Sequence, residues 1–288
     1  IDKSIIVSSL KNYCFLLLSM VRQCVRRLFQ VVLFRILFIG KKVILTQPIT
    51  LIDTFAIPGY YSKDRYYNGL WESLSNSEKI GIKFVPTIVM TNANKLFHAF
   101  RELINAERQF LFKESYLKFS DIFYAILYPI RVRFIKIRSV VMDGIDYSSL
   151  INTELHNRAG YSLAIEGLIN YRFIKRLKEN NVKIRIFIDW WESQSLDKGS
   201  HKALNKYFPK VPVVGYLGYA PRELELQLYP ADYELYNNVV PEKIAVIGKA
   251  FVDGLKIFNP NHDIEIAPAF RFQHLWNGEP HKPDPNKY

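Results

Sequence analysis

The sequence has little of what identifies a secreted or metal-binding protein. Only two of its 288 residues are cysteines, Cys14 and Cys24, and they have the spacing of neither a disulfide framework nor a zinc site. The amino end lacks a basic start, and no small-residue cleavage site follows its apolar run, so a secretory signal peptide is not predicted. We therefore expect a reduced compartment and no bound metal.

Long uncharged runs and glycine fingerprints are also missing. Arginines interrupt the apolar segment 12–39, so no run approaches the roughly 18 residues of a membrane-spanning helix. Neither the glycine pattern of dinucleotide-binding folds nor the Walker lysine pattern occurs. There is no sequence repeat and no low-complexity tract, so neither a repeat protein nor a disordered chain is indicated, and we expect an ordinary globular fold.

The composition predicts a large packed core. The chain is 49% hydrophobic and 15% aromatic, far from the profile of a disordered protein. At roughly 100–200 residues per domain, the length suggests one large or two ordinary domains, and we prefer two. Because the chain begins at Ile1 and ends in the turn-rich segment 283–288, we expect it to be a fragment of a longer protein.

Positive charge is concentrated near the amino end. The net charge is +12, and residues 1–42 hold eight Lys and Arg residues but one acidic residue. On a helical wheel the segment 12–39 has a basic side and an apolar side, interrupted only by Arg35. The basic side holds Arg22, Gln23, Arg26, Arg27 and Gln30, and the apolar side holds Val21, Val25, Leu28, Phe29, Val32 and Ile36. Such a helix either lies in the headgroup layer of an anionic membrane or packs on its own domain with a solvated basic face.

Strand and helix patterns alternate along the rest of the chain. We expect strands at 42–46 and 82–89, a loop at 53–69 and a largely helical segment at 94–125. Because proline cannot donate a hydrogen bond to a neighbouring strand, Pro86 indicates that 82–89 is an edge strand or that Pro86 lies at a strand end. Beyond residue 160 the pattern is regular, with helices at 164–180, 201–207 and 250–258 and strands at 183–189, 211–216, 243–248 and 264–268. This predicts an α/β fold with a mostly parallel, Rossmann-type sheet covered on both faces.

The segment 237–242 is the best linker candidate. We therefore divide the chain into a basic amphipathic helical segment at 1–42, an α/β domain at 43–238 and the incomplete start of a second domain at 239–288.

Ligands of parallel sheets bind outside the carboxyl ends of the strands, so residues at those ends are the first candidates for a site. Asp189 and Glu192 could act as acids or bases beside Trp190, although the tryptophans could equally be core. Tyr216 and Tyr219 follow the next strand, and Gly248 and Lys249 form a turn whose N–H groups suit a phosphate. After the last strand, Arg271 and His274 could reach a donor phosphate, although a lone histidine there is more often structural.

Two further candidates lie outside these strand ends. Glu166 is near the amino end of a predicted helix, where the helix dipole would keep it ionised as a base must be, although simple helix-start electrostatics also explains it. Asp64, Arg65 and Tyr67 form a polar and aromatic cluster in a predicted loop, where acceptor contacts are common. The alternative is an Asp–Arg pair that fixes the loop.

Several of these motifs together resemble a known family. The segments are 52–55 (IDTF), 64–70 (DRYYNGL), 84–87 (FVPT), 165–173 (IEGLINYRF), 215–219 (GYLGY) and 267–274 (APAFRFQH). Over about residues 50–276 the chain resembles bacterial proteins of surface-carbohydrate biosynthesis, of O-antigen or capsule, with a GT-B-like fold. A fainter likeness to bacterial sialyltransferases is weakened because Ile165 replaces an expected acid and no His-Pro pair occurs.

The resemblance implies a glycosyltransferase that moves a sugar from a nucleotide donor to a lipid-linked or growing glycan. We expect no cofactor other than the nucleotide sugar itself and no nucleic-acid partner. Together with the basic helical segment, this predicts a cytoplasmic protein held at the inner face of the membrane. Glu166, Asp189 and Glu192 are then the catalytic candidates. The rivals are a non-catalytic scaffold of polysaccharide assembly and a nucleotide-sugar epimerase of similar fold.

Overall fold

The computed structural model describes residues 3–39, 45, 47–61, 64–89, 92–157, 160–220 and 225–277. Its centre is a six-stranded sheet in which every pair of neighbouring strands is parallel. In spatial order the strands are β2 (Ile82–Ile88), β1 (Ile49–Ala56), β5 (Ile184–Trp190), β6 (Val213–Leu217), β7 (Lys243–Val246) and β8 (Asp263–Ile266). The predicted parallel α/β sheet and its four last strands are confirmed, and β2 is the edge strand that Pro86 suggested.

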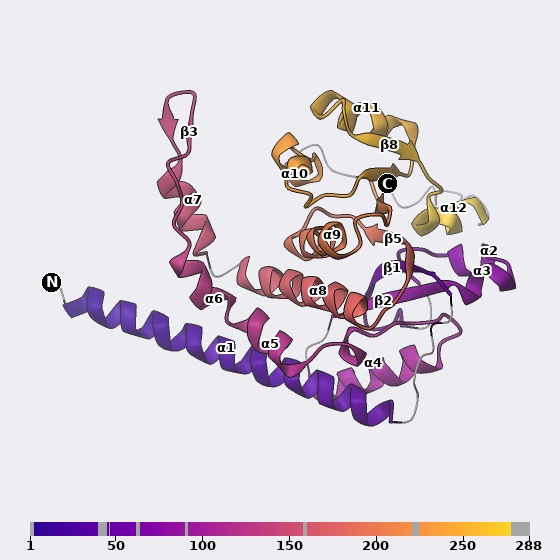
Figure 1. Ribbon diagram of the computed structural model, residues 1–288, viewed down its shortest axis with the longest axis horizontal. Coiled ribbons are helices and arrows are strands. Elements are labelled where there is room, and N and C mark those ends of the chain that lie inside the picture. The colour runs from indigo at the N-terminus through magenta and orange to yellow at the C-terminus, as the bar shows by residue number, and fades with distance from the viewer. Residues whose placement is uncertain are drawn as a thin grey trace, which may run out of the picture.

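Helices cover both faces of this sheet (Figure 1). The long helices α8 (Tyr161–Glu179) and α9 (Ser195–Tyr207) pack on one face together with α5 (Phe119–Ile126). The other face carries α4 (Ala93–Asn105), and α11 (Lys249–Phe258) packs near the β7 and β8 end. The shorter elements are α2 (Leu70–Ser73), α3 (Asn76–Ile80), η1 (Lys113–Ser115), α6 (Tyr128–Arg131), η2 (Val132–Phe134), β3 (Val141–Met142), β4 (Ile145–Asp146), α7 (Ser148–Leu155), η4 (Leu226–Leu228), α10 (Asp232–Tyr236), η5 (Phe270–Phe272) and α12 (Gln273–Asn277).

Two sequence predictions near the amino end need correction. The loop predicted at 53–69 begins inside β1, a strand that pairs on both sides and whose side chains are buried on both faces. A strand buried on both faces lacks the polar and apolar alternation by which strands are recognised. Of the strand predicted at 42–46, all residues but Leu45 lie outside the described residues, and Leu45 is not in a strand.

The predicted domain boundary between residues 238 and 239 falls within the sheet. β6 and β7 lie on either side of this boundary in sequence and are paired neighbours, with Gly215 opposite Ile244. Residues 243–266 therefore extend the sheet that the preceding residues form, rather than beginning a second sheet.

The strand order creates one place where the sheet reverses direction. The chain goes from β1 outward to β2, then returns to β5 on the other side of β1 and continues outward to β8. In doubly wound sheets, ligands bind at the carboxyl ends of the strands that flank such a reversal. Here these are the ends of β1 and β5, after Ala56 and Trp190.

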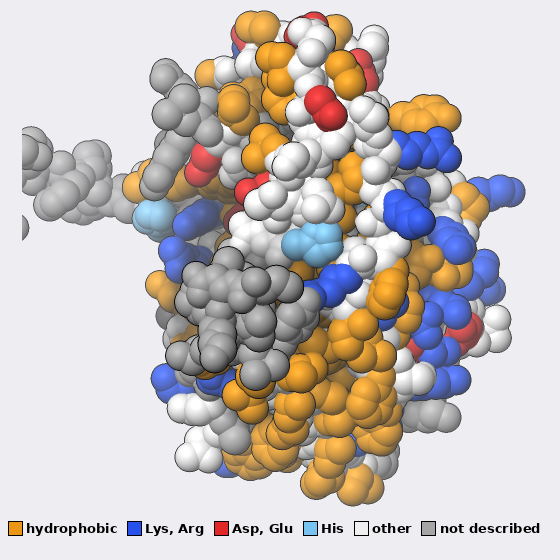
Figure 2. Space-filling view, turned by 90° about the vertical axis from the view of Figure 1, so that its left-hand side faces the viewer, with side chains coloured by type: hydrophobic (Ala, Val, Ile, Leu, Met, Phe, Trp, Pro, Cys, Tyr) orange, Lys and Arg blue, Asp and Glu red, His pale blue; other side chains and the backbone are white. Residues whose placement is uncertain are grey.

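The predicted amphipathic helix is present as α1 (Lys3–Leu37), which extends well beyond the sheet (Figure 1). Its inner side packs on the domain through Leu16, Met20, Val31 and Phe34. Most of the apolar side that the helical wheel predicts points outward, since Val21, Val25, Phe29, Val32 and Ile36 are exposed, whereas Leu28 packs against the core. Figure 2 shows hydrophobic side chains gathered on the lower part of the face toward which α1 projects. None of the described helices is long and apolar enough to cross a membrane.

Candidate functional site

Two buried aspartates lie side by side near the carboxyl ends of the reversing strands. Ile52 of β1 is paired with Ile188 of β5. The residues that follow them, Asp53 and Asp189, therefore lie next to each other, on the face of the sheet that α8 and α9 cover. Both side chains are nearly inaccessible. Burial raises the pKa of each carboxyl to about 7, against the lowering influence of Lys113. Near neutral pH this pair therefore holds protons that exposed aspartates have lost.

A histidine from α9 closes one side of the aspartate pair. Nε2 of His201 lies 2.8 Å from Oδ2 of Asp189, although the two groups are not aligned as a hydrogen bond. Burial lowers the pKa of His201 to about 4, so the imidazole is neutral at pH 7. Asp197 accepts hydrogen bonds at the start of α9 from the N–H groups of Gln194 and Glu192. Within the described chain, no group of three or more His, Cys, Asp or Glu side chains could hold a metal ion.

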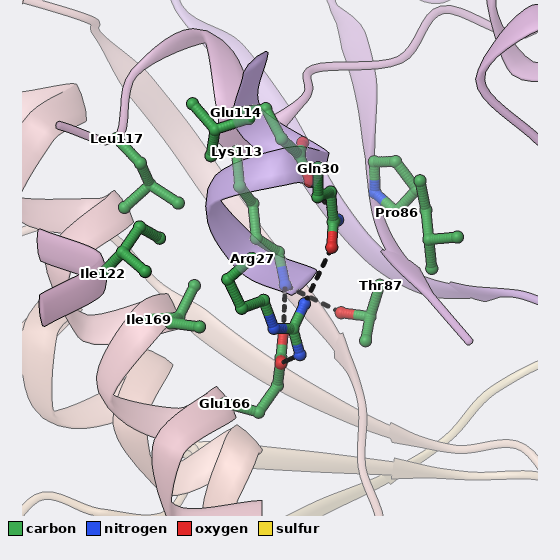
Figure 3. A pocket seen from close by; sticks show the side chains of 12 residues that line it. Arg27, Gln30, Pro86, Thr87, Lys113, Glu114, Leu117, Ile122, Glu166 and Ile169 are labelled. Atoms are coloured by element: carbon green, nitrogen blue, oxygen red, sulfur yellow. Dashed lines mark hydrogen bonds and ion pairs between the residues drawn. The ribbon is translucent and has the colours of Figure 1, made fainter. Parts of the chain in front are cut away.

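Lys113 connects this pair to the helix above it. Its Nζ donates to Thr87 Oγ1 at 2.7 Å and lies 3.8 Å from Glu166 Oε1 (Figure 3). It also donates to Asn170 Oδ1 at 2.6 Å. The side chain is 5% exposed, so its charge is balanced almost entirely by these neighbours. Because Asp53 and Asp189 also feel the charge of Lys113, the lysine is the centre of one continuous buried polar cluster.

Glu166 forms the outer wall of this cluster. It is 7% exposed and pairs with Arg27 of α1, which also donates to Gln30 (Figure 3). Burial alone would raise the pKa of Glu166, but the charges of Arg27, Lys113 and Arg26 outweigh it and lower the pKa. The carboxylate is therefore ionised, as the sequence analysis expected. It lines a cavity of about 20 Å³ with both polar and apolar walls, enough for about one water molecule.

The aspartate pair gives a testable dependence of stability on pH. A carboxyl whose folded pKa is raised binds more protons when folded, so its contribution to stability is lost as the pH rises from about 4 to about 7. Asp53→Asn removes this loss. Between about pH 4 and about pH 7, the free energy of unfolding of the variant should therefore rise relative to that of wild type, on the order of 1 kcal/mol per pH unit. Urea unfolding at pH 5 and pH 8 measures the effect. The exposed Asp253→Asn is the control, and an Asp53→Asn effect that is equal at both pH values would contradict the assignment.

A second group of polar side chains lies at the rim of the sheet, on the side of Trp190. Glu192 accepts hydrogen bonds from Trp190 Nε1 at 2.7 Å and from Gln194 Nε2 at 2.6 Å. The ring of Tyr219 stacks on Trp190, and the Arg271 guanidinium lies 5.9 Å from the centroid of the same indole.

Tyr66 completes this rim cluster. Its ring meets the edge of Trp190 at a centroid distance of 4.5 Å. Burial raises the pKa of Tyr66 and Tyr219, and Glu192 raises both further. The cluster formed by Tyr66, Glu192, Tyr219 and Arg271 is partly exposed, unlike the aspartate pair.

Several predicted site residues are structural. Trp190 is fully buried, so its core interpretation is correct, and Tyr67 stacks on Tyr216 in the same core. The Tyr216 hydroxyl donates to the carbonyl of Pro268 at 2.8 Å, which fixes the segment after β8. Asp64 does fix its loop through an Asp–Arg pair, but the partner is Arg108. Arg65 is exposed, beside the ring of Tyr60.

The predicted catalytic carboxylates fall into different environments. Asp189 is 1% exposed, Glu166 is ion-paired, and only Glu192 lies in the partly exposed rim cluster. Of the predicted donor-binding residues, Arg271 joins that cluster. Gly248 and Lys249 begin α11 just after β7, and His274 is exposed in α12.

The sequence analysis missed the buried half of the site. Asp53, Lys113 and His201 were not recognised as candidates, because β1 was assigned to a loop and the other two lie in helical segments. An aspartate within the apolar run 49–56 was the available signal, since a buried carboxyl needs a specific partner.

No family model and no curated protein matches this sequence. Among solved structures, the chain is similar to an O-ureido-L-serine synthase with 11% sequence identity, over 89% of this chain and 84% of that chain. The TM-score of 0.23 is too low to support an inference about fold or reaction.

Proposed function

We propose that this chain is part of a GT-B-like glycosyltransferase of bacterial surface-polysaccharide biosynthesis, which transfers a sugar from a nucleotide donor to a lipid-linked or growing glycan. The observation that carries this proposal is the rim cluster of Tyr66, Glu192, Tyr219 and Arg271. Side chains from three strand ends and one loop meet there, at the edge where parallel sheets bind ligands. The resemblance in sequence to surface-carbohydrate proteins supports the same class.

The chemical types in the rim cluster suit sugar transfer. The planar guanidinium of Arg271 can donate two hydrogen bonds to a donor phosphate, and aromatic rings can pack against the face of a sugar. In the transfer, the acceptor oxygen bonds to the anomeric carbon while the bond from that carbon to the phosphate oxygen breaks. The nucleotide leaves with the bonding electrons, and a carboxylate takes the acceptor proton.

Glu192 is the carboxylate we propose for that proton. A base must lie within hydrogen-bond reach of the acceptor hydroxyl. Glu166 is held by Arg27, and Asp189 is enclosed under α8 and α9. Glu192 alone among these three is partly exposed, and Trp190 and Gln194 hold it in place.

Substitution of Glu192 tests the proposal. In the intact protein, Glu192→Gln should lower kcat for sugar transfer about a hundredfold, which is within the usual range for loss of a general base. Folding should be unchanged, because the amide oxygen can still accept from Trp190. Transfer is measured with nucleotide sugars and a lipid-linked acceptor, and the exposed Glu107→Gln serves as the control. Full activity of Glu192→Gln would remove it as the base.

A non-catalytic scaffold is the second candidate. The enclosure of Asp189 and the ion pairing of Glu166 favour it, because two of the three predicted catalytic carboxylates are already engaged within the domain. If the intact protein transfers no sugar with any donor tested but still assembles with other polysaccharide enzymes, the scaffold becomes the better assignment.

The proposal includes attachment to an anionic membrane surface, at the inner face of the cytoplasmic membrane. The outward apolar side of α1, next to exposed Arg22 and Arg26, supports this location. Binding to lipid vesicles is the measurement for it.

A further inference from the structure

The segment 267–277 crosses the carboxyl ends of the strands as a strap. It begins just after β8, where the N–H of Ala267 donates to the carbonyl of Val246 in β7 at 2.8 Å. Its later residues meet β6, then β5 and then the loop between β1 and α2, in the order in which these strands lie in the sheet. The strap therefore covers the edge at which the rim cluster lies, and it carries Arg271 into that cluster.

One hydroxyl group holds the near part of the strap. The Tyr216 hydroxyl, near the end of β6, donates to the carbonyl of Pro268 at 2.8 Å and accepts from the N–H of Phe270 at 3.2 Å. The rings of Tyr216 and Phe270 also pack together, with a centroid distance of 5.9 Å. Burial raises the pKa of Tyr216 to about 12, so the hydroxyl keeps its proton at neutral pH. Residues 268–270 are thus fixed to the sheet.

The far part of the strap, residues 271–277, rests on its neighbours without such an anchor. Within the described ranges, the hydrogen bonds that join the strap to the sheet are made by Ala267, Pro268 and Phe270. The side chains of residues 271–275 are partly or fully exposed. A segment with few buried contacts opens at a low cost in free energy.

A glycine forms the seat on which the far part rests. The Gln273 side chain occupies the space of a Cβ atom at Gly69, since an added Cβ would lie 1.5 Å from Gln273 Oε1. Gly69 has a φ of +79°, a left-handed backbone conformation that favours glycine. The seat therefore requires glycine both for its backbone and for the space that Gln273 fills.

The far part of the strap brings a charge to the rim cluster. Burial and the charge of Glu192 raise the pKa of Tyr66 and of Tyr219, and the charge of Arg271 acts in the opposite direction on both. The guanidinium lies 5.9 Å from the centroid of the Trp190 indole, which both tyrosine rings contact. Because Arg271 belongs to the strap, this positive charge moves wherever the far part moves.

We propose that residues 271–277 form a lid over the rim cluster, hinged at the part of the strap that Tyr216 holds. The lid lifts from Gly69 to admit the nucleotide sugar and closes with Arg271 on a phosphate of the donor, which excludes water from the transferred sugar. The identity of this ligand rests on the proposed function. Opening of the lid is a property of the chain alone and can be measured without a ligand.

A distance between two spin labels measures the opening. The labels are attached to Asn76→Cys in α3 and His274→Cys in the lid, both exposed positions, in the full chain with Cys14→Ser and Cys24→Ser. Double electron–electron resonance should show a short distance for the closed lid and a longer distance for the open one. A single narrow distance under every condition would overturn the lid.

Gly69→Ala should favour the open lid. The added methyl group displaces the flexible end of Gln273, so the ratio of open to closed molecules should rise about fivefold, which corresponds to about 1 kcal/mol. Gly59→Ala is the matched control, because Gly59 has a similar φ of +85° and no atom within 4 Å of an added Cβ. If Gly69→Ala does not fold, Gln273→Ala removes the same contact from the lid side. Equal ratios in the Gly69 or Gln273 variant and in the control would overturn the seat.

Nucleotides test what the lid captures. At least one of UDP, GDP, dTDP and CMP should shift the distances toward the closed lid, since a ligand favours the state that it contacts more. Arg271→Gln should abolish this shift, whereas Lys210→Gln, which removes the same charge from an exposed position elsewhere, should not. No shift with any of the four nucleotides would overturn the donor role of the lid.

The lid and the proposed function can fail separately. Closure on a nucleotide by a protein that transfers no sugar would uphold the lid and contradict the transferase. Sugar transfer by a protein whose labels stay at one fixed distance would refute the lid and leave the proposed function intact.

Discussion

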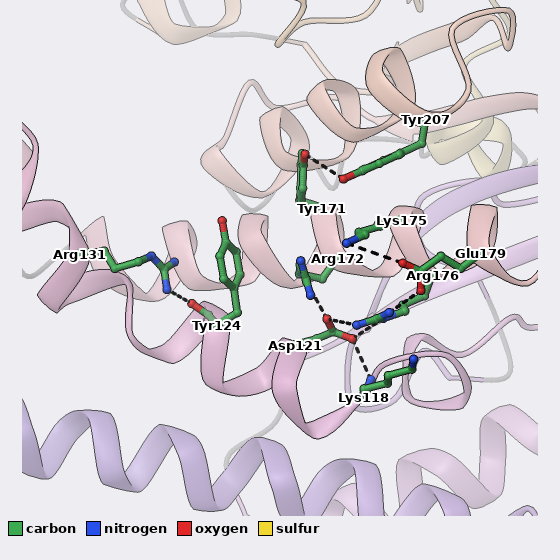
Figure 4. A network of polar contacts seen from close by, with 10 residues as sticks. All are labelled: Lys118, Asp121, Tyr124, Arg131, Tyr171, Arg172, Lys175, Arg176, Glu179 and Tyr207. Carbon is green, nitrogen blue, oxygen red and sulfur yellow. Dashed lines mark hydrogen bonds and ion pairs between the residues drawn. The ribbon is translucent and has the colours of Figure 1, made fainter.

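Asp121→Ala should destabilise the protein by about 3–5 kcal/mol, the usual cost of removing one partner from a buried ion pair. Asp121 is completely buried and accepts from Arg172 Nε at 2.6 Å and from Arg176 Nε and Nη2 at 2.7 and 2.8 Å (Figure 4). It also accepts from the Lys118 N–H at the start of α5. Without Asp121, Glu179 is the acidic partner left to the guanidinium of Arg176 among the residues that the structure describes.

The pH dependence of this cluster has the opposite sign to that of Asp53. Burial would raise the pKa of Asp121, but hydrogen bonds from Arg176, Lys118 and Arg172 outweigh it and lower the pKa. Its contribution to stability is therefore present above the unfolded pKa and is lost as the pH falls through the folded pKa. Urea unfolding at pH 7 measures the Asp121→Ala effect, with Asp253→Ala as the exposed control. A loss below about 1 kcal/mol would show that the cluster does not stabilise the fold.

Gly199→Ala should destabilise the protein by about 3 kcal/mol, even though alanine is the better helix former. A Cβ atom at Gly199 in α9 would lie 2.0 Å from the carbonyl oxygen of Gly167 in α8. The two helices also approach closely at a second point, where a Cβ at Gly167 would lie 2.3 Å from the Ser195 carbonyl oxygen. Forcing such an overpacked contact typically costs 1–3 kcal/mol, and the backbone position puts this one at the upper end.

Gly254→Ala is a matched control for this prediction. Gly254 lies inside α11, and the nearest atom to an added Cβ is the Tyr229 hydroxyl at 4.0 Å. With no clash, alanine should stabilise the helix by up to about 1 kcal/mol. Opposite signs for the two variants in thermal unfolding would establish the close contact of α8 and α9. Equal signs would contradict it.

Local patterns predicted the second half of the fold better than the first. From residue 160 onward, the four strands and the longer helices α8, α9 and α11 are visible as periodic segments, and the sheet follows from their alternation, whereas the short helices α10 and α12 were not predicted. The strand Ile49–Ala56 was missed because both of its faces are buried. The length of α9 was also underestimated, since its first turn, from Ser195 to Lys198, is polar or charged at three of four positions.

The rim of the site could be predicted in outline, because residues at the ends of parallel strands share one edge. Glu192, Tyr219 and Arg271 were found in this way. The buried cluster could not, because its contacts join distant segments: Lys113 meets Asn170 across 57 residues and Arg27 meets Glu166 across 139. No pattern in one sequence reports such pairs.

The position of α1 in the chain determines when its surfaces become covered during synthesis. The helix is made before the segments on which it packs, and Glu166, the partner of Arg27, follows 139 residues later. At 5–20 residues per second, the ribosome needs about 7–28 s to add that length of chain. During this time the inner side of α1, with Leu16, Met20 and Val31, has no domain to cover it. A nascent chain therefore presents both apolar sides of this basic helix to its surroundings, and the finished protein presents one.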